Sequence, residues 1–291
     1  MAAEIIYGKE LAESIRARLK DEVAELHSQQ IHPKLAVVIL GNDPASQSYV
    51  KGKKKASANI GMDAELIELS EETTQAELLD VVDRLNQDTD IHGILVQLPL
   101  PDHINEDVII EAISPEKDVD GFHPISIGRM MAGKETFLPC TPLGIMTMFH
   151  EKGISIRGKH AVVVGRSRIV GKPVGQLLLN EHATVTYCHS RTENMDKYIQ
   201  EADILIVAVG KPGFVHGDQI KDGAVVIDVG VNRIEDGTLT GDVDFESAKE
   251  KASYITPVPR GVGPMTITML LQNTIQAAKQ IHHATTQGSP S

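Results

Sequence analysis

Short apolar runs of strand length alternate with helical segments along most of this chain. Residues 34–40, "KLAVVIL", are the first such run, and residues 160–164, "HAVVV", open a second series. An uninterrupted apolar run of this length is typical of a strand that is buried on both faces, as in a parallel sheet. The alternation therefore predicts an α/β fold in which helices cover both faces of a parallel sheet.

A break in this rhythm divides the chain into two series. Residues 114–124, "SPEKDVDGFHP", read as a loop, and residues 139–153 as a connecting helix. We expect one domain over residues 1–139, completed by a C-terminal helix over 265–291, and a second over 140–264. The second is expected to be Rossmann-like, since four further strand-length runs fall within it.

Composition argues against several classes of protein. Acidic residues outnumber basic ones 40 to 28, so a broad basic face for nucleic acid or an anionic membrane is not expected. The apolar runs are much shorter than a membrane span, and the N-terminal residues lack the pattern of a secretory signal. Cys140 and Cys188 are too few for a disulfide framework or a zinc site. We therefore expect a cytoplasmic protein without a bound metal.

Local sequence patterns add detail to three of the predicted helices. Thr74 and Glu77 have the spacing of a capping box at a helix start. The helix predicted after residue 173 is expected to turn Leu177–Leu179 inward. Residues 282–291 are polar, and we expect them to fray.

Residues 165–175, "GRSRIVGKPVG", lie between a predicted strand and a predicted helix. Such a turn brings backbone N–H groups and a helix N-terminus toward an anion, usually a phosphate. The spacing is not the GxGxxG dinucleotide pattern, because the glycine after Gly165 is Gly171, and it is not a P-loop. Taken alone, the stretch is also compatible with a purely structural turn.

The end of the next predicted strand bears on the choice of cofactor. A site for NAD usually has an acid there to bind the ribose 2′-hydroxyl, whereas arginine suits a 2′-phosphate. This chain has His189, Ser190 and Arg191 after "TVTYC", and Arg166 on the glycine turn. Two guanidinium groups and a hydroxyl can surround a phosphate dianion. The sequence therefore favours NADP.

In the first domain, Tyr49 and Lys53 are spaced to share one face of a helix. A lysine among several neighbouring lysines most often belongs to a solvated surface. Gln97, however, ends a predicted strand, and Asp120 stands in a turn. Strand ends and the loops after them are where α/β sheets place ligands. These residues are therefore candidates for a substrate site.

Seven short motifs together resemble one enzyme family. They are "YVKGK", "VQLPLP", "PEKDVDGF", "PCTP", "VVVGRSRIVGKPVG", "CHSRT" and "TPVPRGVGPMT", in order over nearly the whole chain. The set closely resembles the bifunctional methylenetetrahydrofolate dehydrogenase/methenyltetrahydrofolate cyclohydrolase family. The resemblance implies NADP-dependent oxidation of 5,10-methylenetetrahydrofolate to the methenyl cation and its hydrolysis to 10-formyltetrahydrofolate, within one-carbon metabolism and purine biosynthesis. It also implies a homodimer whose subunits bind folate in a cleft between a catalytic and an NADP-binding domain.

The resemblance implies roles for individual residues. Lys53 would be the central catalytic residue, supported by Gln97, while Tyr49 would pack on the aminobenzoyl ring of the folate. Asp120 would hold the pterin. The implied cofactor contacts, together with Arg191, are Gly165, Arg166, Ser167, Ser190 and Val231, and further folate contacts are Pro259, Gly261 and Gly263.

Arg260 is the clear departure from the family pattern, which usually has glycine at this position. We expect a negative φ at Arg260 and a side chain directed to solvent, because arginine does not adopt a positive φ without strain. There it could bind a carboxylate of the folate's glutamate tail, or be an unpaired surface arginine.

Two other readings of the sequence remain. A different Rossmann dehydrogenase, acting on an amino acid or a hydroxy acid, would leave Lys53, Gln97 and Asp120 without a shared role. A non-catalytic NADP-binding regulatory protein would have no need of Lys53.

Overall fold

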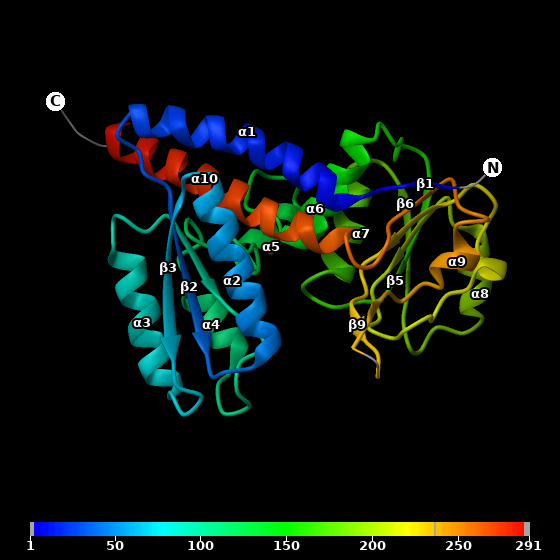
Figure 1. Cartoon of the computed structure of the whole chain (residues 1–291), viewed down its shortest axis with the longest axis horizontal. Coiled ribbons are helices and arrows are strands. Elements are labelled where there is room, and N and C mark those ends of the chain that lie inside the picture. The colour runs from blue at the N-terminus through cyan, green and yellow to red at the C-terminus, as the bar shows by residue number, and fades with distance from the viewer. Residues whose placement is uncertain (1–2, 236, 288–291) are drawn as a thin grey trace. The chain divides into compact units, whose positions relative to one another are not determined.

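The computed structural model describes residues 3–235 and 237–287, and the chain divides into two compact units. The large-sheet unit comprises the chain up to Glu13 and Thr141–Thr266, and the small-sheet unit comprises Ser14–Cys140 and the chain from Ile267 (Figure 1). The N-terminal segment therefore groups with the second series of strands, which corrects the expected domain boundaries. The reason is that β1 (Glu4–Ile5) pairs in parallel with β11 (Tyr254–Ile255).

The small-sheet unit is built on a parallel sheet of order β3-β2-β4. Alternate residues of the central strand, Ala36, Val38 and Leu40, pack against α3 and α4, while α2 packs against β2 and β3. The elements of this unit are β2 (Lys34–Leu40), α2 (Pro44–Asn59), β3 (Asp63–Leu69), α3 (Gln75–Gln87), β4 (Gly93–Val96), α4 (Glu106–Ala112) and α5 (Pro124–Met131).

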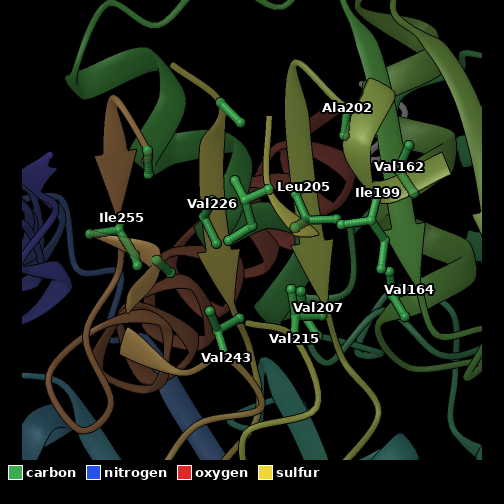
Figure 2. Close-up of a cluster of buried hydrophobic side chains, with 14 of the residues drawn as sticks. Val162, Val164, Ile199, Ala202, Leu205, Val207, Val215, Val226, Val243 and Ile255 are labelled. Carbon is green, nitrogen blue, oxygen red and sulfur yellow. The ribbon is translucent and has the colours of Figure 1, made fainter. Parts of the chain in front are cut away.

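The large-sheet unit has a parallel sheet of order β1-β11-β8-β7-β5-β6. From β5 the chain adds β6 on one side and β7 on the other, so the strand order reverses beside β5. Val162, Leu205 and Val226 of adjacent strands pack with Ile199 of α8 in the core of this unit (Figure 2). The remaining elements of this unit are β5 (His160–Val164), α7 (Gly171–Asn180), β6 (Thr184–Cys188), α8 (Met195–Glu201), β7 (Ile204–Val207), η1 (Gly217–Gln219), β8 (Val225–Asp228), β9 (Asn232–Arg233), β10 (Leu239–Thr240) and α9 (Phe245–Ala248).

Three helices contain the points at which the chain passes between the units. They are α1 (Gly8–Ser28), α6 (Cys140–Glu151) and α10 (Val262–Gln287). Helix α10 continues through residues 282–287, which corrects the expectation that these residues fray; residues 288–291 lie outside the described part. No glycine or proline stands between Pro264 and Gly288 to end this helix earlier.

The local predictions for α3 and α7 have different outcomes. The capping box is confirmed: the Glu77 N–H donates to the Thr74 hydroxyl, and the Thr74 N–H donates to the Glu77 carboxylate. The inward orientation of all three leucines is wrong, because Leu179 is 51% exposed while Leu177 and Leu178 are buried. Three consecutive helical residues spread over about 200° of the helix surface, so they cannot all face one core.

Among the described residues, no helix combines the length and the apolar character needed to cross a membrane.

Candidate active site

Lys53 lies on α2, one turn after Tyr49, and is only 9% exposed. Its ammonium donates a hydrogen bond to Gln97 Oε1 at 2.8 Å. Gln97 directly follows β4, and its backbone N–H donates to the Val38 carbonyl at 2.8 Å. Its Nε2 donates to the Leu98 carbonyl at 2.7 Å, which directs the amide oxygen toward the lysine. Two of the candidate residues named from the sequence therefore lie within hydrogen-bond distance of each other.

Asp120 lies near this lysine because residues 117–119 continue alongside β4. The Ile94 N–H donates to the Lys117 carbonyl at 2.8 Å, and Ile94 forms a parallel bridge with Asp118. Asp118 is buried and shapes the turn that carries Asp120. Its carboxylate accepts hydrogen bonds from Phe122 N (3.2 Å), His123 N (2.9 Å) and Ser126 Oγ (2.9 Å).

The electrostatics of Lys53 and Asp120 are coupled. Burial lowers the pKa of Lys53 below its usual value, and the nearby Asp120 partly opposes this shift. Burial raises the pKa of Asp120, and the nearby Lys53 partly opposes that shift. A base with a lowered pKa and an acid with a raised pKa are suited to proton transfer nearer to neutral pH.

Two residues of this site were missed by sequence reasoning. The Cys140 thiol, at the start of α6, donates to the Val119 carbonyl at 3.3 Å. Asn273 of α10 is buried, and its Nδ2 donates to the carbonyls of Val119 (2.8 Å) and Leu138 (3.1 Å). Both therefore hold the peptide that precedes Asp120. A lone asparagine within an apolar helix carries no local signal of such a distant contact.

Tyr49 is half exposed on α2, so its ring offers a flat apolar surface next to the buried lysine. The other predicted site residues lie in the large-sheet unit.

The glycine turn between β5 and α7 leaves no room for side chains at three positions. Gly165 has φ +129°, and a Cβ there would overlap the Ala208 carbonyl. A Cβ at Gly171 would overlap the Gly165 carbonyl, and one at Gly175 would overlap the Tyr187 ring of β6. A dinucleotide-binding turn needs glycines for these same reasons: a tight turn, close backbone approach and close packing of helix on strand.

Polar groups surround the N-terminus of α7. Ser167 Oγ accepts hydrogen bonds from the N–H groups of Val170 and Gly171, each at 3.2 Å, so its own proton can be donated to an anion. Arg166 follows β5, and Arg191 with Ser190 follows β6; all three are exposed. Because β5 and β6 are paired neighbours, the two loops leave the same sheet edge side by side. The residues therefore fit a dinucleotide that carries an additional phosphate.

The turn before α10 differs from the prediction at Arg260. Its φ is +82°, so the expected negative φ is wrong, although the side chain is exposed as expected. The turn is tightly packed, since a Cβ at Gly261 would overlap the Pro257 carbonyl and the Arg260 carbonyl accepts a hydrogen bond from Lys9 N–H at 3.0 Å. Arg260 thus adopts a left-handed backbone conformation within a closely packed turn. Pro259 and Gly263 of the same turn are exposed.

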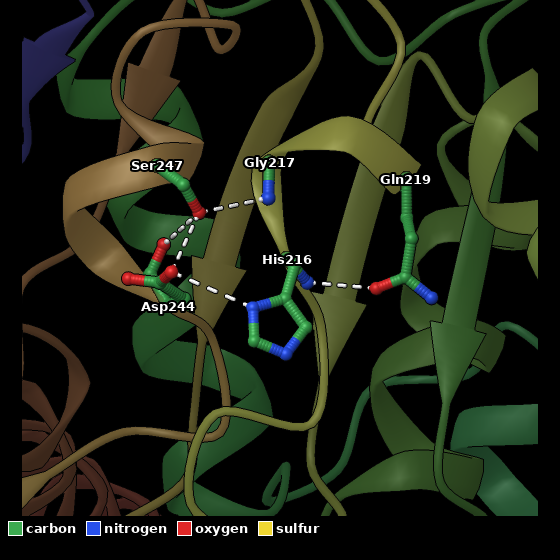
Figure 3. Close-up of polar contacts among 5 residues, drawn as sticks. All are labelled: His216, Gly217, Gln219, Asp244 and Ser247. Carbon is green, nitrogen blue, oxygen red and sulfur yellow. Dashed lines mark hydrogen bonds and ion pairs between the residues drawn. The ribbon is translucent and has the colours of Figure 1, made fainter.

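A second polar cluster has the residue types of a hydrolytic triad but not its geometry (Figure 3). Asp244 Oδ2 accepts from Ser247 Oγ at 2.8 Å and lies 3.5 Å from His216 Nδ1. Ser247 Oγ accepts from Gly217 N at 2.9 Å. The carboxylate thus stands between serine and histidine, so the histidine cannot take the serine proton. The cluster instead joins η1 to α9.

Two family models match the chain. Residues 6–120 match the catalytic domain of tetrahydrofolate dehydrogenase/cyclohydrolase, and residues 139–282 match its NAD(P)-binding domain. The chain belongs to the tetrahydrofolate dehydrogenase/cyclohydrolase family. The resemblance read from the motifs, the two-domain α/β architecture and the nicotinamide dinucleotide cofactor are thereby confirmed.

Individual relatives agree with this assignment. The Bifunctional protein FolD of Bacillus subtilis is 62% identical over 280 residues, which cover 96% of this chain and 99% of that protein. The crystal structure of FolD from Campylobacter jejuni has a TM-score of 0.95 and 50% identity, covering 96% of this chain and 99% of that one. The FolD of Trypanosoma brucei, solved with NADP cofactor and an inhibitor, has a TM-score of 0.93 at 41% identity, covering 96% and 98%.

Proposed function

We propose that this chain oxidises 5,10-methylenetetrahydrofolate to the 5,10-methenyl cation with NADP and then hydrolyses the cation to 10-formyltetrahydrofolate. The observation that carries this proposal is the buried Lys53 ammonium, hydrogen-bonded to Gln97 and coupled to Asp120. It lies in the part of the chain that matches the family's catalytic domain.

NADP, when bound, supplies the acceptor for a hydride. The glycine turn, Ser167 and the N-terminus of α7 would hold its bridging phosphates. Arg166, Ser190 and Arg191 would bind the 2′-phosphate, which gives a preference for NADP over NAD.

The oxidation step mainly requires alignment of the substrate carbon with the nicotinamide. The hydride leaves a carbon between two nitrogens and creates a delocalised cation, so no strong base is required. Tyr49 would stack on the aminobenzoyl ring. Asp120 would accept paired hydrogen bonds from the pterin 2-amino group and ring nitrogen. Pro259, Gly261 and Gly263 are proposed as further folate contacts.

The hydrolysis step requires proton transfer. Water adds to the methenyl carbon and loses one proton, which gives a neutral hydroxyl adduct. The bond from that carbon to N5 then breaks as the hydroxyl proton passes to N5, leaving a formyl group on N10. Lys53 would accept the proton, since its lowered pKa increases the fraction of neutral amine. Gln97 would orient the amine.

A homodimer in the cytoplasm is proposed on the family resemblance and on the composition alone. Two free cysteines and no disulfide are in keeping with a reducing compartment.

The test is to mix the purified protein with 5,10-methylenetetrahydrofolate and NADP and to record the NADPH and methenyl absorbance bands together. We expect NADPH to accumulate while the methenyl band rises and then decays. NADP binding without turnover would contradict the proposal and favour a non-catalytic binding protein. Reduction of NADP only with an amino acid or a hydroxy acid would favour a different dehydrogenase.

A further inference from the structure

The strand order indicates which loops meet the nicotinamide half of the cofactor. In the proposed function, the adenosine 2′-phosphate binds at the loop after β6 together with Arg166, and the bridging phosphates bind at the turn after β5. Because β5 lies between β6 and β7, the other half of the dinucleotide extends along the carboxyl ends of β7 and β8. The loops after these two strands, residues 208–212 and 229–231, therefore form the nicotinamide side of the proposed site.

Asp242 anchors both of these loops. The residue is fully buried in the segment after β10. Its Oδ2 accepts hydrogen bonds from Val209 N at 2.7 Å and Gly210 N at 2.9 Å. Its Oδ1 accepts from Lys211 N at 2.8 Å and from Asn232 Nδ2 at 2.9 Å. Three successive backbone N–H groups thus enclose one carboxylate, as in the concave anion sites called nests.

Asp228 holds Asp242 in place from the end of β8. It is 3% exposed, and its Oδ1 accepts from Gly230 N and from Asp242 N, both at 3.0 Å. Its Oδ2 accepts from Val243 N at 2.9 Å. A Cβ at Gly230 would overlap the Asp242 carboxylate, so the loop approaches the acid as closely as a backbone can. Each acid thereby fixes the backbone around the other.

Val231 stands between two residues that these acids restrain. Its neighbours Gly230 and Asn232 donate to Asp228 and to Asp242, respectively. Val231 itself is 48% exposed, although it is an aliphatic residue. An exposed valine on a loop fixed at both sides has the character of a surface that packs on a ligand.

We propose that Asp228 and Asp242 are positioning residues of the dehydrogenase: through the turn at 209–211, Gly230 and Asn232, they hold the loops after β7 and β8 in the shape that receives the nicotinamide half of NADP. This inference rests on the proposed function. Neither carboxylate touches the cofactor or the folate in this role, and neither is needed for hydrolysis.

The test begins with Asp242→Asn, which keeps the volume of the side chain. The amide nitrogen of the asparagine replaces an oxygen that accepted hydrogen bonds from two N–H donors. Because that nitrogen cannot accept them, the hydrogen bonds to one of the two oxygens are lost. We expect the Kd and KM for NADP to rise about tenfold or more. Hydrolysis of 5,10-methenyltetrahydrofolate without NADP should stay within about threefold of wild type, since Lys53, Gln97 and Asp120 belong to the small-sheet unit.

Two further variants make the result specific. Asp244→Asn is the control, because Asp244 lies two residues after Asp242 but joins η1 to α9. The KM of this variant for NADP should stay within about twofold of the wild-type value. Asn232→Ala removes one donor and keeps both acids, so its KM for NADP should rise about threefold with hydrolysis unchanged. If Asp242→Asn does not fold, Asn232→Ala decides the question.

A folded Asp242→Asn protein with the wild-type Kd for NADP would overturn the proposal. So would a parallel loss of both activities with a large fall in Tm, because that result indicates support of the whole unit. The Kd is measured without turnover. A wild-type protein lacking both activities would contradict the proposed function, and the Kd comparison would still test the positioning role.

Discussion

At the residue scale, the surroundings of Lys53 change its acid–base chemistry. Burial lowers its pKa, so at a given pH more of the amine is neutral than in an exposed lysine. If the neutral amine accepts the proton, kcat/KM for hydrolysis should rise with pH and level off below the usual lysine pKa of about 10.4.

Replacement by arginine tests this assignment. Lys53→Arg keeps the positive charge, but a guanidinium stays protonated throughout the accessible range, so hydrolysis should fall by about 100-fold and lose its rise with pH. Lys54→Arg, at the exposed neighbouring position, should keep the wild-type profile. The wild-type pH profile in Lys53→Arg would exclude Lys53 as the base. The profile is measured after subtraction of uncatalysed hydrolysis.

The backbone of Arg260 is strained, and the amino-acid sequence around it did not predict this strain. Its φ of +82° is readily adopted by glycine but costs a residue with a side chain about 1 to 2 kcal/mol. Arg260→Gly should therefore raise the free energy of unfolding by about 0.5 to 1 kcal/mol, after the entropy that glycine adds to the unfolded chain. Arg260→Ala keeps the strain and should give no gain. Equal stability of the two variants in urea unfolding would show that the turn relaxes without strain.

At the scale of elements, the loops after β5 and β6 form the proposed 2′-phosphate site. Arg166→Ala combined with Arg191→Ala should remove most of the preference for NADP over NAD, on the order of 2 to 4 kcal/mol for two charge-assisted contacts. Lys197→Ala, which removes one positive charge on α8, is the control and should leave the preference unchanged. The measurement is kcat/KM with each dinucleotide. Equal values for NAD and NADP in the wild type would refute this pocket.

Elements with a strong local pattern were predictable, and those that depend on distant pairing were not. The expected strands at 34–40 and 184–188 have these bounds in the structure. The strand that Gln97 was expected to end stops one residue earlier, at Val96, and prolines, which cannot donate to a sheet, soon follow. Strand β1 has two residues and is defined only by its partner β11, so no local pattern marks it.

The same distinction applies to the candidate sites. Lys53, Gln97 and Asp120 could be proposed because each stands at a helix face, a strand end or a turn where ligands bind. Asn273 and the Asp228–Asp242 pair could not, because their roles follow from hydrogen bonds to backbone groups far along the chain. A buried aspartate after a strand looks in sequence like any turn residue.

At the scale of the whole molecule, the proposed function makes oxidation depend on the alignment of the folate with NADP, and hydrolysis depend on the buried Lys53. Lys53→Met separates the two, because it keeps an unbranched side chain but removes the amine. The decisive measurement records NADPH and the methenyl band together after mixing this variant with 5,10-methylenetetrahydrofolate and NADP. NADPH should still form, and the methenyl cation should accumulate because its hydrolysis is slowed by about 100-fold or more. A methenyl band that decays at the wild-type rate would contradict the central role of Lys53.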